Sequence, residues 1–117
     1  MTSHTFDRVD SSQCLEIKLR SKAMAVKEVV VYTVHEHAVA GLAAASATMD
    51  AFLATHSGFV RRTVHADAKT PNRFMDTVEW LSLAEAEQAA RAVETEPSIV
   101  VFMQAIASID MMSHFVA

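Results

Sequence analysis

Cysteine is almost absent from this sequence. The 117 residues include a single one, Cys14, so no disulfide can form within the chain, which agrees with a reducing compartment. No histidine or basic cluster adjoins Cys14 to activate its thiol, and we expect the side chain to be inert.

Long apolar runs are also missing. The first residues, Met1 to Arg8, lack the apolar stretch of a signal peptide, and no segment reaches the roughly 18 consecutive apolar residues of a membrane span. We therefore expect a cytoplasmic protein that makes no membrane contact.

Concentrated positive charge is the third absence. The net charge is −4, and lysine and arginine are scattered without forming a basic stripe, so nucleic acid is not an expected partner. Apolar residues, in contrast, make up 51% of the chain, enough for a folded core. We expect a flexible N-terminal segment over residues 1–13 and one domain over residues 14–117.

The segment Val26–Val34 has the longest uninterrupted set of β-branched and aromatic residues. In a strand, Val30, Tyr32 and Val34 would point to one side and Val29, Val31 and Thr33 to the other. Since both sides are apolar, this is predicted to be a central strand that is covered on both faces.

Three further segments alternate between apolar and polar residues, as strands do. Cys14–Arg20 predicts an extra edge strand. Phe59–Ala66 predicts a strand with Val60 and Arg62 on one face and Phe59 and Arg61 on the other. The turn-forming segment 67–72 then leads into its hairpin partner, Phe74–Trp80.

The last predicted strand is Ala105–Val116. Strict alternation puts Asp110, Met112 and His114 on one side and Ile109 on the other. Asp110 is unusual in this largely apolar strand, and we expect it to pair with an arginine across a dimer or, failing that, to have a raised pKa.

Two helices are predicted, with a third, shorter one favoured over an extended segment at Pro97–Met103. Ala38–His56 has helical apolar spacing and is followed by Gly58, which suits a left-handed helix cap. The second helix begins at Ser82, where Ser82 and Glu85 form a capping box in which each side chain bonds the other's backbone N–H, and it ends before Pro97.

The order strand, helix, strand, strand, helix, strand predicts an α+β fold of the ferredoxin-like βαββαβ type, with an antiparallel sheet, both helices on one face and the extra N-terminal edge strand. The other face of such a sheet would be uncovered. A homodimer that packs two such faces together is the simplest way to bury it.

The segment Val78–Ser82 places Trp80 at the end of a strand, directly before a capped helix of the form Ser-x-x-Glu-Ala, and Gly58 opens the second strand. With this element order, residues 25–117 resemble the dimeric α/β barrels, and among them the antibiotic-biosynthesis-monooxygenase-like family. The resemblance implies cofactor-independent monooxygenation of an aromatic or polyketide-like compound. The asparagine and histidine of the haem-degrading branch are absent from the corresponding regions, which hold Val29 and Ala89, so we expect no haem and no other cofactor.

This fold would gather the candidate site residues around one pocket between helices and sheet. Substrate-binding residues would be Trp80, Phe52, Met112 and Val30, and the candidate catalytic residues are His114 and His56, which could take a proton from a phenolic ligand. The alternative is that these side chains only pack in the core and that His56 complements the negative end of the first helix.

A metal site is a weaker possibility. His35 and His37 share a strand face, and His65 or Asp76 could supply a third ligand, but a His-x-His pair alone also fits a polar turn, and we expect no bound metal. Arg62 and its neighbour Arg61 could neutralise an acidic substrate or lie on an exposed strand face.

Two functional classes therefore remain. The first is an oxygenase-like small-molecule enzyme that binds an aromatic ligand. The second is a non-catalytic ligand-binding or stress-associated dimer with the same barrel. An open cavity beside Trp80 would favour the enzyme.

Overall fold

The computed structural model describes residues 24–116; the predicted segment 1–13 and edge strand Cys14–Arg20 lie outside this range. Nine elements follow one another: β1 (Val26–Val34), η2 (Glu36–Ala38), α2 (Val39–Leu53), β2 (Phe59–Ala66), β3 (Arg73–Trp80), α3 (Leu83–Val93), η3 (Pro97–Ile99), α4 (Val100–Ala105) and β4 (Ile106–Val116). The predicted α+β element order is confirmed, including the short helix after Pro97.

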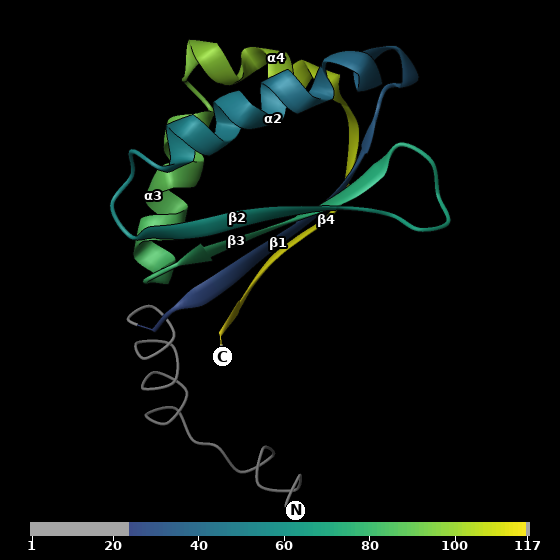
Figure 1. Cartoon of the computed structure of the whole chain (residues 1–117). Coiled ribbons are helices and arrows are strands. Elements are labelled where there is room, and N and C mark those ends of the chain that lie inside the picture. Colours follow the sequence, from purple (N-terminus) through teal and green to yellow (C-terminus); the bar gives the residue numbers. More distant parts are fainter. Residues whose placement is uncertain (1–23, 117) are drawn as a thin grey trace, which may run out of the picture.

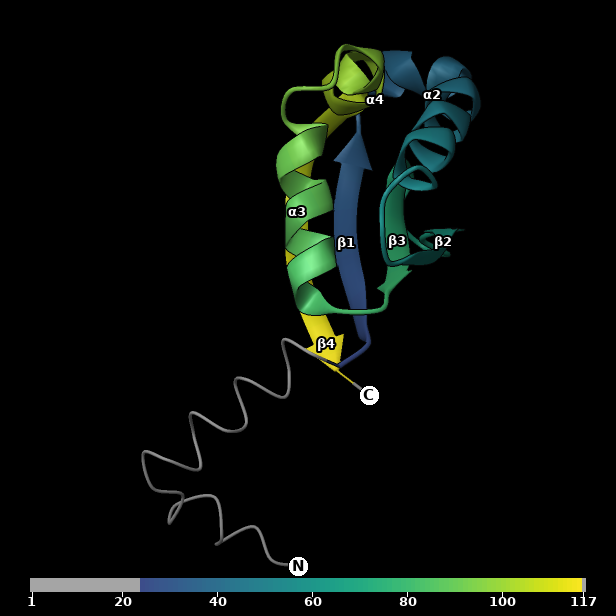
Figure 2. The same ribbon diagram turned by 90° about the vertical axis from the view of Figure 1, so that its left-hand side faces the viewer.

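The four strands form one antiparallel sheet in the order β2-β3-β1-β4, which is the ferredoxin-like arrangement. All the helices lie on one face of this sheet (Figure 1). In the view turned by 90°, α3 and α2 stand apart, with α3 on the β4 side of β1 and α2 above β3 and β2 (Figure 2). In residues 24–116 no helix has the length and hydropathy needed to cross a membrane.

The helix ends agree only partly with the local sequence signals. Helix α2 ends at Leu53, earlier than the predicted His56, and its cap is Ala54 in a right-handed conformation instead of Gly58. Gly58 has φ = 85°, the left-handed conformation of the turn that leads into β2. At the start of α3 the Ser82 hydroxyl accepts from the backbone N–H of Glu85 at 3.2 Å, as predicted. The Glu85 carboxylate, however, accepts from the hydroxyls of Ser82 and Ser57, at 2.9 and 2.6 Å, instead of from the predicted backbone N–H of Ser82.

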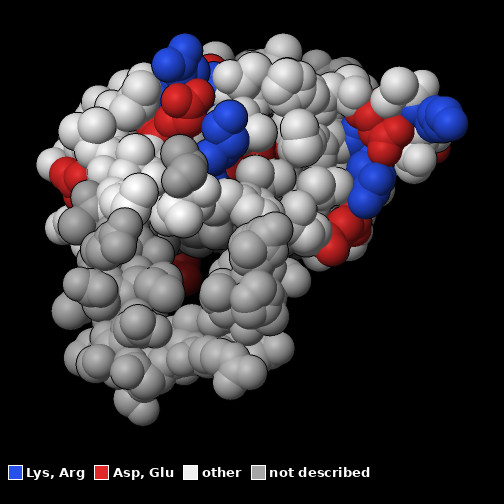
Figure 3. All heavy atoms as spheres, turned by 90° about the horizontal axis from the view of Figure 1, so that it is seen from below, with Lys and Arg blue, Asp and Glu red and all other residues white. Residues whose placement is uncertain are grey.

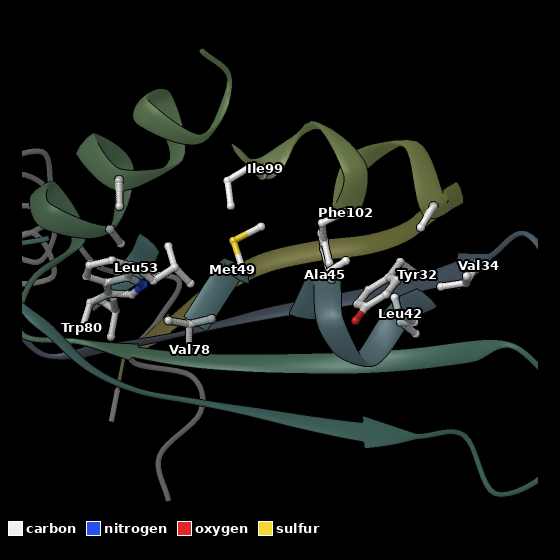
Figure 4. Close-up of a cluster of buried hydrophobic side chains, with 14 residues drawn as sticks. Tyr32, Val34, Leu42, Ala45, Met49, Leu53, Val78, Trp80, Ile99 and Phe102 are labelled. Atoms are coloured by element: carbon white, nitrogen blue, oxygen red, sulfur yellow. The ribbon is translucent and has the colours of Figure 1, made fainter. Parts of the chain in front are cut away.

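The core lies between the helices and the sheet, and its side chains point toward one another from both layers (Figure 4). Trp80, Tyr32 and Ile99 are its largest fully buried side chains. Trp80 and Tyr32 lie toward opposite ends of this cluster, since Val26 of β1 pairs with Trp80 while Tyr32 pairs with Phe74.

The sheet contains three register shifts, two in β4 and one in β2. The first shift in β4 and the one in β2 correct the side-chain directions predicted from strict alternation. In β4, Met111 pairs with Val31 but Ile109 pairs with Tyr32, so Asp110 has no partner position and the strand changes face there. Ile109 consequently lies on the helix side with Met112, and Asp110 lies on the outer side, the reverse of the prediction for both.

The register shift in β2 is also a bulge. Phe59 pairs with Trp80 and Arg61 with Glu79, so Val60 is the extra residue. Phe59 therefore shares the helix side with Arg62, where its ring meets that of Trp80 edge to face at 5.6 Å between centroids.

The outer sheet face is not covered by any described residue. It presents the half-buried Val29, Val31 and Met75 together with the exposed Met111 and Phe115. Where grey atoms do not hide it, this face is mostly white between groups of charged side chains (Figure 3).

Candidate functional site

A cavity of about 250 Å³ lies between the helices and the sheet. Its walls are largely apolar, with Met49 from α2, Val30 from β1, Val78 and Trp80 from β3, and Met112 from β4. Met112 is 47% exposed although it lines the cavity, so the β4 side is open to solvent.

Three of the predicted substrate-binding residues, Trp80, Met112 and Val30, line this cavity. The fourth, Phe52, and the predicted catalytic residues His56 and His114 are not among its lining residues. The Phe52 and His56 rings pack edge to face at 4.6 Å between centroids, and His56 Nδ1 lies 3.0 Å from the Phe52 carbonyl oxygen. His56 thus belongs to the end of α2, in agreement with the alternative in which it only complements that helix end.

The cavity holds a polar network that sequence reasoning missed. The Tyr32 hydroxyl donates to Asp76 Oδ1 at 2.7 Å, and Arg62 donates to Asp76 Oδ2 from Nε at 3.0 Å and from Nη2 at 2.7 Å. All three side chains line the cavity, and that of Arg62 is only 1% exposed. A buried arginine is tolerated here because it is paired with a buried carboxylate.

Arg62 also joins the sheet to α2. Its Nη1 donates to Asp50 Oδ1 at 2.7 Å and to the Ser46 hydroxyl at 2.8 Å, and its guanidinium lies 5.4 Å from the centre of the Phe102 ring. Burial opposes the charge on Arg62, but the carboxylates of Asp76 and Asp50 outweigh burial and raise the pKa of Arg62.

The Tyr32 hydroxyl remains protonated, and so remains a hydrogen-bond donor, at neutral and moderately alkaline pH. Burial, and then the hydrogen bond to Asp76, raise the pKa of its hydroxyl well above the ordinary value. Tyr32 and Arg62 therefore provide fixed hydrogen-bond donors in the cavity wall.

A second polar group lies nearer Trp80. Glu28 lines the cavity, and its Oε1 accepts from the Trp80 Nε1–H at 3.3 Å. Its Oε2 is 3.7 Å from Nε2 of His114, the predicted catalytic histidine, which is the β4 residue paired with Glu28. Burial raises the pKa of Glu28, while His114 and the Trp80 hydrogen bond act in the opposite direction.

The predicted metal ligands do not converge. His35 and His37 stack on each other with ring centroids 5.2 Å apart, and Asp76 is turned to Arg62 and Tyr32. Across residues 24–116 no three histidine, cysteine, aspartate or glutamate side chains are close enough together to hold a metal ion.

Asp110 finds its arginine within the same chain, which corrects the expected pairing across a dimer. Its Oδ1 accepts from Ser108 at 2.7 Å, and its Oδ2 accepts from Arg73 at 3.0 Å and from Thr33 at 2.9 Å. These hydrogen bonds, that of Ser108 first, lower the pKa of Asp110 instead of raising it. Arg61, unlike its neighbour Arg62, is exposed and pairs with Glu79 at 2.9 Å.

One signal in the sequence points to part of the missed site. In β1, Glu28 has the same parity as Val30 and Tyr32, so a carboxylate and a phenol interrupt an apolar face at regular spacing. Arg62 and Asp76 gave no such signal, because they lie in different strands and meet only through the β2–β3 register.

No protein-family model matches this chain, and no curated protein matches its sequence. Among solved structures it is similar to SnoaB, a cofactor-independent oxygenase from Streptomyces nogalater, with 25% identity and a TM-score of 0.61 over 81% of this chain and 94% of SnoaB.

Two other similar structures come from proteins assigned to the antibiotic biosynthesis monooxygenases. The one from Bordetella bronchiseptica is 16% identical, with a TM-score of 0.66 over 80% of this chain and 97% of that one. The one from Nitrosomonas europaea is 11% identical, with a TM-score of 0.65 over 81% and 91%. At such identities these two likenesses concern the fold alone.

Proposed function

We propose, from the premise that this chain belongs to the antibiotic-biosynthesis-monooxygenase-like family of dimeric α/β barrels, that it oxidises a small aromatic or polyketide-like molecule with dioxygen and without a cofactor. The observation that carries the proposal is the cavity beside Trp80, whose walls are apolar and whose polar groups are few and fixed. Such a composition is typical of small-molecule sites.

The size of the cavity favours a compact planar ligand. Its volume of about 250 Å³ is slightly below the range of about 300–1,000 Å³ that is usual for ligand pockets. Trp80 is 1% exposed, so a ligand would touch only a small part of its ring, and Val30, Met49 and Met112 would supply most of the apolar contact.

The polar groups suggest how such a ligand would be oriented. The Cα atoms of Glu28 and Tyr32 are about 13 Å apart, from four residues of strand at about 3.3 Å each. The Glu28 carboxylate and the Tyr32–Asp76 pair would thus contact different parts of one ligand. A phenol with a second oxygen or an extended ring system could contact both polar groups.

Oxidation without a cofactor requires that the substrate supply the electrons. In a naphthol, loss of the phenolic proton gives an electron-rich anion that can pass one electron to dioxygen. The two radicals join at the ring carbon opposite the phenolic oxygen and form a hydroperoxide. Loss of water then leaves a quinone, so one oxygen atom ends in the carbonyl and the other in water, and no reductant is consumed.

The protein's part in this reaction is to bind the ring and accept the proton. His114, predicted from the sequence as a catalytic residue, is kept here as a proton-handling group because it lies next to Glu28. His56 is not kept, since its ring packs on Phe52 at the end of α2.

Binding can be tested with the chain's own fluorophore, since Trp80 is its only tryptophan. We expect naphthols and bicyclic quinols to quench its emission saturably and to raise the melting temperature. The variant Trp80→Phe keeps an aromatic wall and should retain the shift in melting temperature, although it has no emission to quench.

Catalysis is tested by oxygen uptake with 1-naphthol and by the absorbance of the quinone product. Consumption of one dioxygen per quinone, without added metal, flavin or haem, is the expected result. Saturable binding without oxygen uptake would instead support the non-catalytic ligand-binding dimer. If a panel of phenols, quinols and flavins gave no binding and no oxygen uptake, both proposals would lose their support.

A further inference from the structure

If the cavity binds phenols as proposed above, we infer that Glu28 is the base that accepts their proton and that His114 is the positioning residue that receives it from Glu28. Glu28 is the carboxylate nearest Trp80 in the cavity wall, and its two oxygens have different neighbours. The inference therefore adds a residue and a proton path to the proposed reaction.

Glu28 is held in place from both sides. It is on β1, where Val78 of β3 and His114 of β4 are its register partners. The Trp80 Nε1–H at 3.3 Å fixes Oε1, which orients the carboxylate in the cavity wall beside Trp80. Trp80 can thus align the base next to a bound ligand.

The second oxygen, Oε2, is the one that can take a proton. Its neighbour His114 Nε2 is 3.7 Å away, which is too long for a hydrogen bond. His114 Nε2 is also buried, and it has no hydrogen-bond partner among the described residues. An unpaired buried nitrogen is costly, and Glu28 is the described residue whose carboxyl group lies near enough to become its partner after a small movement.

The protonated Glu28 carboxyl is such a partner. When a phenolic proton moves to Oε2, the neutral acid can donate to His114 Nε2, provided that the imidazole carries its own proton on Nδ1. Transfer of that proton to Nε2 restores the Glu28 carboxylate and leaves it paired with an imidazolium. The phenolate then remains beside Trp80 as the electron donor to dioxygen.

The surroundings of Glu28 favour a stronger base than an exposed carboxylate would be. Burial raises its pKa above the ordinary 4.5, His114 and the Trp80 hydrogen bond lower it, and Asp76 raises it. Across the cavity, Arg62 is already paired with Asp76 and Asp50. The α3 residues that line the cavity are apolar up to Val93, and only Glu94 adds a charge at its end.

The decisive variant is Glu28→Gln, which keeps an acceptor for the Trp80 Nε1–H and nearly the same shape but cannot take a proton. We expect kcat for 1-naphthol oxidation to fall by a factor of about 10² to 10⁴. Quenching of Trp80 by the same ligand should change by no more than a few-fold. The matched control is Glu79→Gln, because Glu79 is on the outer sheet face beside Arg61 and should affect neither quantity.

A second measurement does not depend on turnover. Titration of the wild-type protein should show a step in Trp80 emission above pH 4.5, as the Glu28 carboxyl that faces Nε1 loses its proton. The step should be absent in Glu28→Gln and unchanged in Glu79→Gln. In His114→Ala it should move to higher pH, since the group that favours the carboxylate is gone, and the acidic limb of the rate profile should move with it.

The outcomes separate this inference from the function on which it rests. Wild-type protein that neither binds nor oxidises naphthols would overturn both. Active wild-type protein whose Glu28→Gln variant retains its kcat would overturn only the role of Glu28. An unchanged rate profile in a folded His114→Ala protein would remove His114 from the proton path.

Discussion

At the residue scale, the burial of the charged pair Arg62 and Asp76 is the feature on which we expect stability to depend most strongly. The Arg62 side chain is 1% exposed and that of Asp76 is 9% exposed, so both charges have lost nearly all their hydration. Removing one partner leaves the other charge buried, which is far more costly than losing one neutral hydrogen bond.

We therefore expect Asp76→Ala to lower the free energy of unfolding by about 3–5 kcal/mol, because Arg62 would keep only the exposed Asp50 as a counter-ion. Tyr32→Phe removes one hydrogen bond to the same carboxylate and should cost about 1–3 kcal/mol. Urea unfolding of the two variants measures the difference. Equal losses would show that the ion pair contributes no more to stability than the tyrosine hydrogen bond.

The raised pKa of Glu28 gives a second prediction at this scale. A carboxyl group whose pKa is higher in the folded state favours folding when protonated, and this contribution is lost as the pH rises from about 4.5 through the folded-state pKa. Glu28→Gln should thus have the higher melting temperature at pH 7, and its advantage should disappear below pH 4.5. A difference that stays constant between pH 4 and 8 would contradict the raised pKa.

At the element scale, Gly58 connects α2 to β2. Its φ of 85° is unfavourable for other residues, and a Cβ atom there would overlap the carboxylate of Glu85, which bonds Ser57 and Ser82 at the start of α3. The turn between α2 and β2 is therefore packed closely against the start of α3.

Gly58→Ala should lower the free energy of unfolding by about 1–2 kcal/mol from the left-handed backbone alone, with displacement of Glu85 in addition. The chain provides a matched control in Gly41, which is inside α2, where an added Cβ atom would have no neighbouring atom within 4 Å. Gly41→Ala should stabilise the protein by about 0.5–1 kcal/mol. Thermal or urea unfolding that gives both changes the same sign would refute this account.

The elements themselves could be predicted because each has a local cause: β-branched residues in β1, Gly58 after α2, the Ser82 cap of α3 and Pro97 before α4. The directions of side chains in β2 and β4 could not, because a bulge changes strand parity without changing composition. Asp110 looked like a misplaced polar residue for this reason, whereas the bulge turns it outward to Arg73.

The same limit applies to the candidate site. Trp80, Val30 and Met112 were predicted to line the cavity because the strand order brings them together, and they do line it. The network of Tyr32, Arg62 and Asp76 was missed because its members are 14 and 44 residues apart and meet only when the register of three strands is known. Charged pairs that form only in the tertiary structure are therefore difficult to predict from a single sequence.

At the scale of the whole molecule, the two sheet faces differ in what covers them. The helices cover one face, and the other presents Val29, Val31, Met75, Met111 and Phe115 without cover from described residues (Figures 1 and 3). An apolar area of this kind on a sheet is unfavourable in water and is usually an interaction surface. Strand β1 is apolar on both faces. The helices cover one of these faces, and no described residue covers the other.

We predict that a second copy of the chain supplies this layer, and that the homodimer buries about 2,000 Å² or more. Analytical ultracentrifugation at micromolar concentration should give a dimer. Met111→Glu puts a charge on this face in the edge strand β4, beside Val31, and should weaken association at least tenfold, because burying an unpaired carboxylate is costly. Val101→Glu introduces the same charge on α4, at a side chain that is 66% exposed on the helix side, and should leave the dimer intact. A wild-type monomer, or equal dissociation by the two variants, would show that the outer sheet face is not the dimer interface and that β1 owes its apolar outer side to some other contact.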